Sequence, residues 1–208
     1  MTTANPARFW DRIATKYAAN PVSDVPAYEA TLAHVRQNLS AGDRVLEIGC
    51  GTGTTALALA PSVANYVATD ISGAMLEIGR EKAWNASQSN LSFVKAAADR
   101  GELPDGPFDV VLAFSILHLL DDLDAGLAEI HDRLAPGGLF ISKTVCISPL
   151  SPLRPVIGVM QLIGKAPYVR FLKAAPLIAR IKAAGFEIVE TVDFHKPGKR
   201  PHIVARKL

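Results

Sequence analysis

Cysteine is scarce in this sequence: only two of its 208 residues are cysteines. Cys50 and Cys146 lie far apart and form neither a CxxC motif nor a metal-ligand spacing, so we expect no disulfide framework and no metal site. A catalytic cysteine would require a paired base that the sequence does not reveal. Both cysteines are therefore expected to be reduced and structural.

Long hydrophobic runs are missing as well. No window contains the roughly 18 uninterrupted apolar residues that a membrane-spanning helix requires, and residues 1–26 lack an apolar core of signal-peptide length. Hydrophobic residues nevertheless make up 49% of the chain and charged residues 20%, which is typical of a folded globular protein with a large core. We expect a single domain, residues 1–208, in the cytoplasm.

Acidic residues are absent between Asp132 and Glu187. Residues 1–142 carry 10 Lys and Arg against 17 Asp and Glu, whereas residues 143–208 carry 12 against 3. Such a basic surface can meet an anionic small molecule or a lipid headgroup at a membrane, or it can be a solvated face. Few aromatic residues accompany these charges, so no nucleic-acid partner is expected. Nothing in the sequence fixes an oligomeric state.

The stretch 44–54 carries the strongest local signal, because an apolar run ends in glycines at 49, 51 and 53 and continues into an Ala- and Leu-rich segment. This pattern predicts a strand, a tight turn and a helix that begins at the turn. Glycine tolerates positive φ and lets the backbone approach a ligand closely. Dinucleotide-binding folds use a related GxGxxG turn, but Thr54 stands where they place their third glycine. The turn favours a nucleoside ligand over a plain strand-turn-helix junction.

Asp70 ends the next apolar run, 17 residues after Gly53. An acid at the end of the second strand of a βαβ unit can accept two hydrogen bonds from a ribose diol. The alternative is that Asp70 only caps the helix that opens at Ser72. We expect the ribose interaction to be the more important one, because hydrogen bonds to a charged group contribute about 1.5 to 3 kcal/mol each.

Strand and helix patterns alternate along most of the chain. We expect strands at 44–48, 66–69, 91–95, 108–114, 139–145, 187–193 and 202–207, and helices at 5–38 (two, broken at 20–21), 54–60, 72–85, 122–134 and 174–184. This alternation predicts an α/β fold with a doubly wound, seven-stranded and mostly parallel sheet, whose ligand crevice lies at the carboxyl ends of the strands. The last two strands are joined too tightly for a crossover helix, so the final strand should be antiparallel.

Two segments outside the sheet are candidates for covering a ligand. We divide the chain into an N-terminal helical flap (1–39), a core (40–145), a lid segment (146–173) and a C-terminal helix with antiparallel strands (174–208). The helical spacing of Phe9, Trp10, Ile13 and Tyr17 fits either a packed apolar stripe or aromatic residues that cover a ligand. Residues 156–163 are apolar and too short to cross a bilayer, but they suit a lid or a surface-lying segment.

Five motifs occur in an order that resembles the class I S-adenosylmethionine-dependent methyltransferases, and within them the small-molecule group that includes quinone-biosynthesis methyltransferases. They are residues 45–53, the segment 70–76, Asp99 with Leu103 and Pro104, the segment 108–111, and the segment 134–138. The resemblance spans roughly residues 40–145. It implies methyl transfer from S-adenosyl-L-methionine to a small molecule. The resemblance does not fix the acceptor, but the basic, apolar segment 146–171 would suit a lipophilic or anionic one.

The resemblance also implies roles for individual residues. The glycine turn (Gly49, Gly51, Gly53) with Glu47 would hold the methionine part of the cofactor, and Asp70 the ribose. The adenine would lie between Ile71 and Met75, with Asp99 and Arg100 at its edge. Ser115 would lie in the same crevice at the end of the fourth strand, and Tyr17 would close over the cofactor from the flap.

The catalytic chemistry is less constrained. A sulfonium already activates its methyl group, so alignment of the acceptor matters more than a strong acid or base. His118, just past the fourth strand, is the best-placed candidate for a base; the alternative is a histidine packed among leucines. Two other functions remain open: a nicotinamide-dependent oxidoreductase, disfavoured by Thr54, and a cofactor-binding or membrane-surface module without catalysis.

Overall fold

The computed structural model describes residues 6–20, 22–194 and 198–208. Its helices are α1 (Pro6–Ala19), α2 (Val25–Gln37), α3 (Thr54–Leu59), α4 (Gly73–Asn85), α5 (Leu123–Arg133), α6 (Arg154–Leu162) and α7 (Ala174–Ala183), with short 3-10 helices η1 (Ala60–Ser62) and η2 (Leu117–Leu119). The strands are β1 (Arg44–Ile48), β2 (Asn65–Asp70), β3 (Leu91–Lys95), β4 (Phe108–Phe114), β5 (Leu134–Lys143), β6 (Phe186–Val192) and β7 (His202–Lys207).

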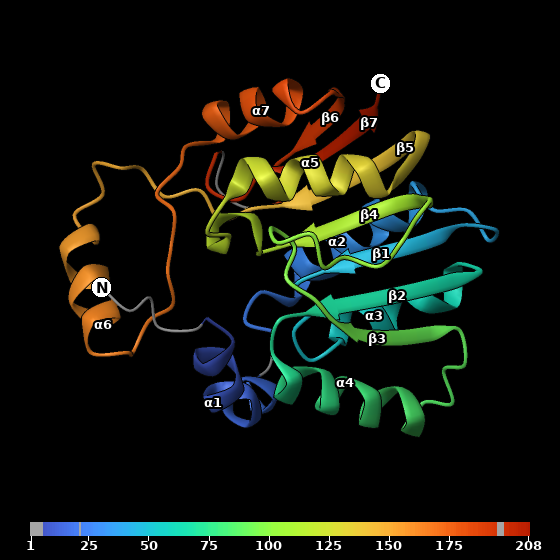
Figure 1. Cartoon of the computed structure of the whole chain (residues 1–208), viewed down its shortest axis with the longest axis horizontal. Coiled ribbons are helices and arrows are strands. Elements are labelled where there is room, and N and C mark those ends of the chain that lie inside the picture. Colours follow the sequence, from blue (N-terminus) through green and yellow to red (C-terminus); the bar gives the residue numbers. More distant parts are fainter. Residues whose placement is uncertain (1–5, 21, 195–197) are drawn as a thin grey trace.

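The strands form one sheet in the order β3-β2-β1-β4-β5-β7-β6 (Figure 1). The first five in this order pair in parallel, and β7 runs antiparallel to both β5 and β6. The predicted α/β fold with a mostly parallel sheet and an antiparallel last strand is confirmed. From β1 the chain adds β2 and β3 on one side, and then β4 and β5 on the other, so the strand order reverses between β1 and β4. Open α/β sheets form their ligand crevice at such a point.

Two apolar layers cover the sheet because the strand side chains alternate between its faces. Val45 packs with α2, α3 and α4, whereas Leu46 and Ile48 pack with α5 and α7. Helix α2 belongs to the first layer, since Leu32 and Val35 are buried there. The core is therefore complete without α1 and α6.

The strand β5 differs from its predicted bounds at both ends. It begins at Leu134, which pairs with Phe108 before a register shift. At Gly138 the backbone of β5 passes close to that of β4, since a Cβ there would lie 2.9 Å from the Asp109 carbonyl oxygen. The strand ends at Lys143, whose partner His202 is the first residue of β7. The regular strand is thus shorter than the predicted end at residue 145, although Thr144 and Cys146 still donate backbone hydrogen bonds to the carbonyl oxygens of Pro201 and Lys199.

Helix α6 stands away from the sheet, and α1 lies beside α4 at the same side of the molecule (Figure 1). None of the α6 residues is buried, and Ala14 is the one buried residue of α1 within its described range. Within the described part of the chain, no helix combines the length and the apolar composition that crossing a membrane demands. The tight connection expected between the last two strands includes residues 195–197, which lie outside the described residues.

Candidate functional site

The glycine turn follows β1 at the point where the strand order reverses. Gly49, Gly51 and Gly53 have φ values of 66°, 55° and 72°, which L side chains rarely adopt without strain. The amide of Cys50 donates to the Thr69 carbonyl oxygen at 2.9 Å, so the turn is fixed to the end of β2. The backbone conformation expected of these glycines is thus present.

Two of the three glycines are also packed tightly by neighbouring side chains. A Cβ on Gly49 would lie 2.7 Å from Ile116, and a Cβ on Gly53 would lie 2.8 Å from the ring of Phe93. Gly51 differs, because its nearest neighbour would be Tyr17, at an ordinary contact distance of 3.7 Å. The open side of the turn is therefore at Gly51.

Asp70 lies at the carboxyl end of β2 and faces the glycine turn. Its two carboxylate oxygens accept hydrogen bonds from the amides of Gly51 and Ser72, each at 2.9 Å. Burial raises the pKa of Asp70, and the two amides oppose that shift. Helix α4 has its own cap, since the Ser72 hydroxyl accepts from the Met75 amide. Asp70 therefore bridges the two turns and is not the cap of α4.

Glu47 lies in β1, two residues before Gly49, and is almost fully buried. The Tyr66 hydroxyl donates to its Oε2 at 2.8 Å. Burial raises the pKa of Glu47 to about 7, although the hydrogen bond from Tyr66 acts in the opposite direction; the Asp70 carboxylate adds to the rise. Glu47 can thus change its charge near neutral pH.

Tyr17 on α1 covers this region. Its pKa is raised by burial and then by the charges of Asp70 and Glu47, which places its hydroxyl in the field of both carboxylates. Helix α1 is held in place by Asp11, whose Oδ1 accepts from the Ser72 hydroxyl at 2.6 Å and from the Ala74 amide at 3.2 Å. The flap is thus anchored at the start of α4, next to Asp70.

The residues expected around an adenine differ in their burial and in their hydrogen-bond partners. Ile71 is half-buried beside Asp70, and Met75 is buried in the first turn of α4. The carboxylate of Asp99 accepts from the Asp122 amide at 3.0 Å, whereas exposed Arg100 pairs with Asp121 at 3.2 Å.

Ser115 follows β4 with a φ of 58°, and its amide donates to the carbonyl oxygen of Lys143 at 2.7 Å. Asp99 and Arg100 thus tie the loop after β3 to the loop before α5, while exposed Ser115 marks the end of β4.

His118 lies in η2 and is 8% exposed. Burial lowers its pKa to about 4, so the imidazole is neutral at pH 7. Its Nδ1 has no hydrogen-bond partner among the described residues. A buried imidazole with this pKa is a weak base, and the geometry favours the packed alternative over the catalytic one.

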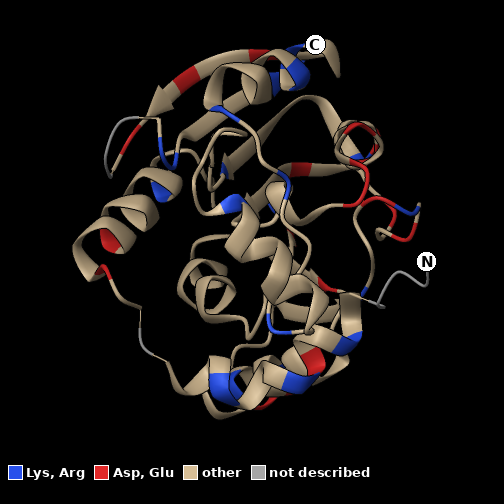
Figure 2. Cartoon of the chain, turned by 90° about the vertical axis from the view of Figure 1, so that its left-hand side faces the viewer, with Lys and Arg blue, Asp and Glu red and all other residues tan. Residues whose placement is uncertain are grey.

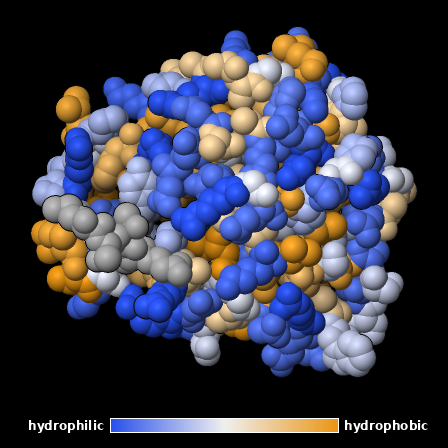
Figure 3. Space-filling model, in the orientation of Figure 1, coloured by the Kyte–Doolittle hydropathy of each residue, from blue (hydrophilic) through white to orange (hydrophobic). Residues whose placement is uncertain are grey.

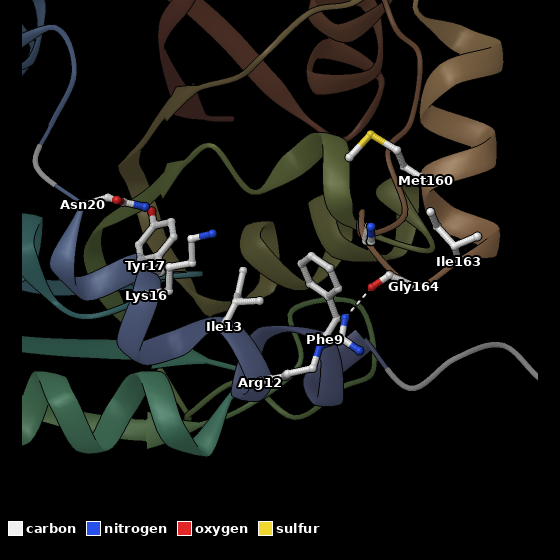
Figure 4. A pocket seen from close by; sticks show the side chains of 10 residues that line it. Phe9, Arg12, Ile13, Lys16, Tyr17, Asn20, Met160, Ile163 and Gly164 are labelled. Atoms are coloured by element: carbon white, nitrogen blue, oxygen red, sulfur yellow. Dashed lines mark hydrogen bonds between the residues drawn. The ribbon is translucent and has the colours of Figure 1, made fainter.

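A cavity of about 660 Å³ separates α1 from α6 (Figure 4). Phe9, Ile13 and Tyr17 line it from α1, whereas Trp10, the fourth residue of the predicted stripe, does not. Its other lining residues are Arg12, Lys16, Asn20, Met160, Ile163, Gly164 and Lys165. Tyr17 is the wall that the cavity shares with the glycine turn.

Sequence reasoning missed several residues that position the site. Asp11 and Ile116 contact it from distant parts of the chain. Lys82 donates to the Thr52 carbonyl oxygen at 3.2 Å and to the Thr54 hydroxyl at 3.3 Å, which fixes α4 to the glycine turn. No local pattern identifies these contacts. The sequence shows only that position 116 is apolar and that position 11 in the first helix is acidic.

Comparisons with known proteins agree on one family. A model of the methyltransferase domain matches residues 45–138. The ubiquinone biosynthesis O-methyltransferase of Pseudomonas aeruginosa (strain UCBPP-PA14) is 28% identical over 89% of this chain and 80% of its own length. The demethylmenaquinone methyltransferase of Clavibacter sepedonicus is 38% identical over 55% of this chain and 46% of its own length.

Solved structures share the fold at lower identity. An S-adenosylmethionine-dependent methyltransferase from Mesorhizobium loti has a TM-score of 0.68 at 19% identity, and covers 84% of this chain and 96% of its own. The cyclase SpnF has a TM-score of 0.71 at 22% identity, with 87% and 80% covered. A cyclase with this fold illustrates that the fold alone does not define the reaction. Taken together, the family match over residues 45–138, the related sequences and the strand order support a class I S-adenosylmethionine-dependent methyltransferase with a small acceptor.

Proposed function

We propose that S-adenosylmethionine lies along the carboxyl ends of β1 and β2, with its ribose on Asp70 and its methionine part at the glycine turn and Glu47. Each Asp70 oxygen accepts one amide hydrogen bond and retains a lone pair for one ribose hydroxyl. A side chain at Gly51 would reach toward Tyr17 across the space that the cofactor needs. The residues present therefore fit this cofactor.

We extend this assignment to the neighbouring residues. Ile71 and Met75 contact the adenine faces and Asp99 its edge. Arg100 instead secures the loop through Asp121. Gly49, Gly53 and Ser115 shape the backbone around the cofactor, and Tyr17 closes over it. The support for these roles is their position around Asp70 and Gly51 at the end of the sheet.

The bound cofactor supplies an electrophilic methyl group, so the protein mainly has to align an acceptor and keep water out. We propose that the acceptor is a small lipophilic hydroxyl compound that enters the cavity between α1 and α6. The observation that carries this proposal is that Tyr17 lines the cavity and also lies over Gly51. The quinone-biosynthesis relatives are consistent with such an acceptor. His118 has no role as a base in this proposal.

A series of alkylated phenols and hydroquinones tests the acceptor class. With a labelled methyl group on the cofactor, kcat/KM should rise about fourfold for each methylene group that the cavity buries. Ile13→Asp should abolish this gain, because the charge makes the cavity wall polar. Equal transfer to all chain lengths, or no transfer to any compound although the cofactor product binds, would exclude a lipophilic hydroxyl acceptor.

We also propose that the outer face of α6 lies on an anionic membrane surface. Val156, Val159 and Leu162 on α6 are 55%, 59% and 87% exposed. These residues follow a helical spacing on the side opposite Arg154 and Gln161, which line a second cavity. Hydrophobic side chains mark the edge of Figure 3 where α6 lies in Figure 1. An exposed apolar helix face in a basic segment suits the lipid headgroup region.

Sedimentation with vesicles measures this contact. The protein should pellet with vesicles that contain phosphatidylglycerol, and Leu162→Asp should release it. Trp84→Asp provides the control, since Trp84 is 85% exposed on α4. No pelleting at low salt, or equal release by both variants, would count against a role of α6.

A further inference from the structure

The cavity between α1 and α6 combines an apolar lining with an excess of positive charge. Its apolar side chains are Phe9, Ile13, Met160 and Ile163, and its charged ones are Arg12, Lys16 and Lys165. No acidic residue lines it. Figure 2 faces this side of the molecule, and the ribbon at the middle of the view is largely neutral or basic. The cavity is therefore apolar and electropositive at once.

The three cations differ in how they are engaged. The Arg12 guanidinium donates to the Gly164 carbonyl oxygen and lies 5.6 Å from the centre of the Phe9 ring, so it connects the two walls (Figure 4). The side-chain ammonium groups of Lys16 and Lys165 make no hydrogen bond or ion pair among the described residues, although the Lys165 amide donates to the Met160 carbonyl oxygen. Asp11, the acid nearest to them in α1, is engaged by Ser72 and Ala74 on α4. Two uncompensated ammonium groups on facing walls thus share one cavity.

We infer that the cavity binds a ligand with an apolar body and an anionic group, such as a carboxylate, with the anion held between Lys16 and Lys165. This rests on the proposed function, in which the cavity receives the methyl acceptor. A volume of about 660 Å³ suits one compound of ordinary ligand size. An anion is attracted by both lysines, whereas a neutral ligand gains nothing from their charge and a cationic one is repelled. The acceptor is thereby narrowed from lipophilic compounds in general to amphipathic anions.

A matched pair of fluorescent probes tests the inference without any knowledge of the acceptor. The two compounds are 8-anilino-1-naphthalenesulfonate and N-phenyl-1-naphthylamine, which differ only in the sulfonate group. The wild-type protein should bind the sulfonate about tenfold more tightly than the neutral probe, a gap that salt should narrow. The variant Lys16→Ala/Lys165→Ala should lose about fivefold to tenfold for the sulfonate and less than twofold for the neutral probe.

Lys182→Ala is the control, since Lys182 is an exposed lysine on α7 outside the cavity. It should leave both affinities unchanged, and melting temperatures should be equal for all variants. Equal binding of the two probes by the wild type, or equal losses in Lys182→Ala and in the double variant, would overturn the inference. Titration of S-adenosylhomocysteine in the same samples separates the two proposals, because a failure there affects the cofactor site and leaves the probe result intact.

Discussion

Glu47 is buried because β1 alternates its side chains between two covered faces of the sheet, and Glu47 lies on the covered face opposite Leu46. An unpaired carboxylate would be costly there. Tyr66 supplies one hydrogen bond, and the remaining cost is expressed as a pKa of about 7. The residue is thus a source of pH-dependent stability.

The Glu47→Gln variant isolates this effect. Between the ordinary pKa of 4.5 and the folded pKa of about 7, the folded protein binds more protons than the unfolded chain. The free energy of unfolding therefore falls as the pH rises through this window. From pH 5 to pH 8, the wild type should lose about 2.5 kcal/mol more than Glu47→Gln. Urea denaturation at the two pH values measures the difference, and identical losses in both proteins would show that Glu47 does not titrate there.

Residues at the site could be predicted where the signal was local. The glycines of the turn and the acid at the end of β2 follow from strand ends and short spacings, and the structure places Asp70 2.9 Å from the Gly51 amide. Contacts such as Ile116 on Gly49 could not be predicted, because they depend on how β4 is placed beside β1. The ion pair between Arg100 and Asp121 could not be predicted for the same reason.

At the scale of elements, the bounds of most helices and strands followed from periodicity and from proline and glycine positions. The start of β5 did not, because Leu134 pairs with Phe108 ahead of a register shift that no local pattern reveals. The position of α1 could not be predicted from a sequence pattern either. It depends on a hydrogen bond between Asp11 and Ser72, which are 61 residues apart.

The Asp11→Ala variant tests whether this anchor matters for the cofactor. Loss of the two hydrogen bonds should free α1 and with it Tyr17, so the Kd for S-adenosylhomocysteine should rise about fivefold, in line with about 1 kcal/mol for an exposed contact. Global stability should change little, because α1 contributes one buried residue within its described range. Hydrogen exchange should accelerate in residues 6–19. Glu81→Ala, which removes an exposed acid on α4, is the control. Unchanged hydrogen exchange in Asp11→Ala would show that Asp11 does not hold α1 in place.

At the scale of the whole molecule, one sheet and two apolar layers bring the ends of β1 and β2 together and leave α1 and α6 outside the core. The sequence was sufficient to predict the sheet, since strands and crossovers follow from pattern and handedness. The cavity between α1 and α6 joins segments about 150 residues apart that contribute no residue to either apolar layer, a distance at which a pattern carries no information. The glycine turn and Asp70 thus lie at the end of the sheet, whereas the cavity lies between segments outside it.

Calorimetric titration of S-adenosylhomocysteine into the wild type and into Asp70→Ala tests the cofactor site most directly. The wild type should bind one equivalent, and loss of two hydrogen bonds to a charged group should weaken binding about a hundredfold or more. Asp132→Ala, an exposed acid on α5, should bind like the wild type, and melting curves should establish that Asp70→Ala is folded. Equal affinity of the folded Asp70→Ala variant and the wild type would contradict the account.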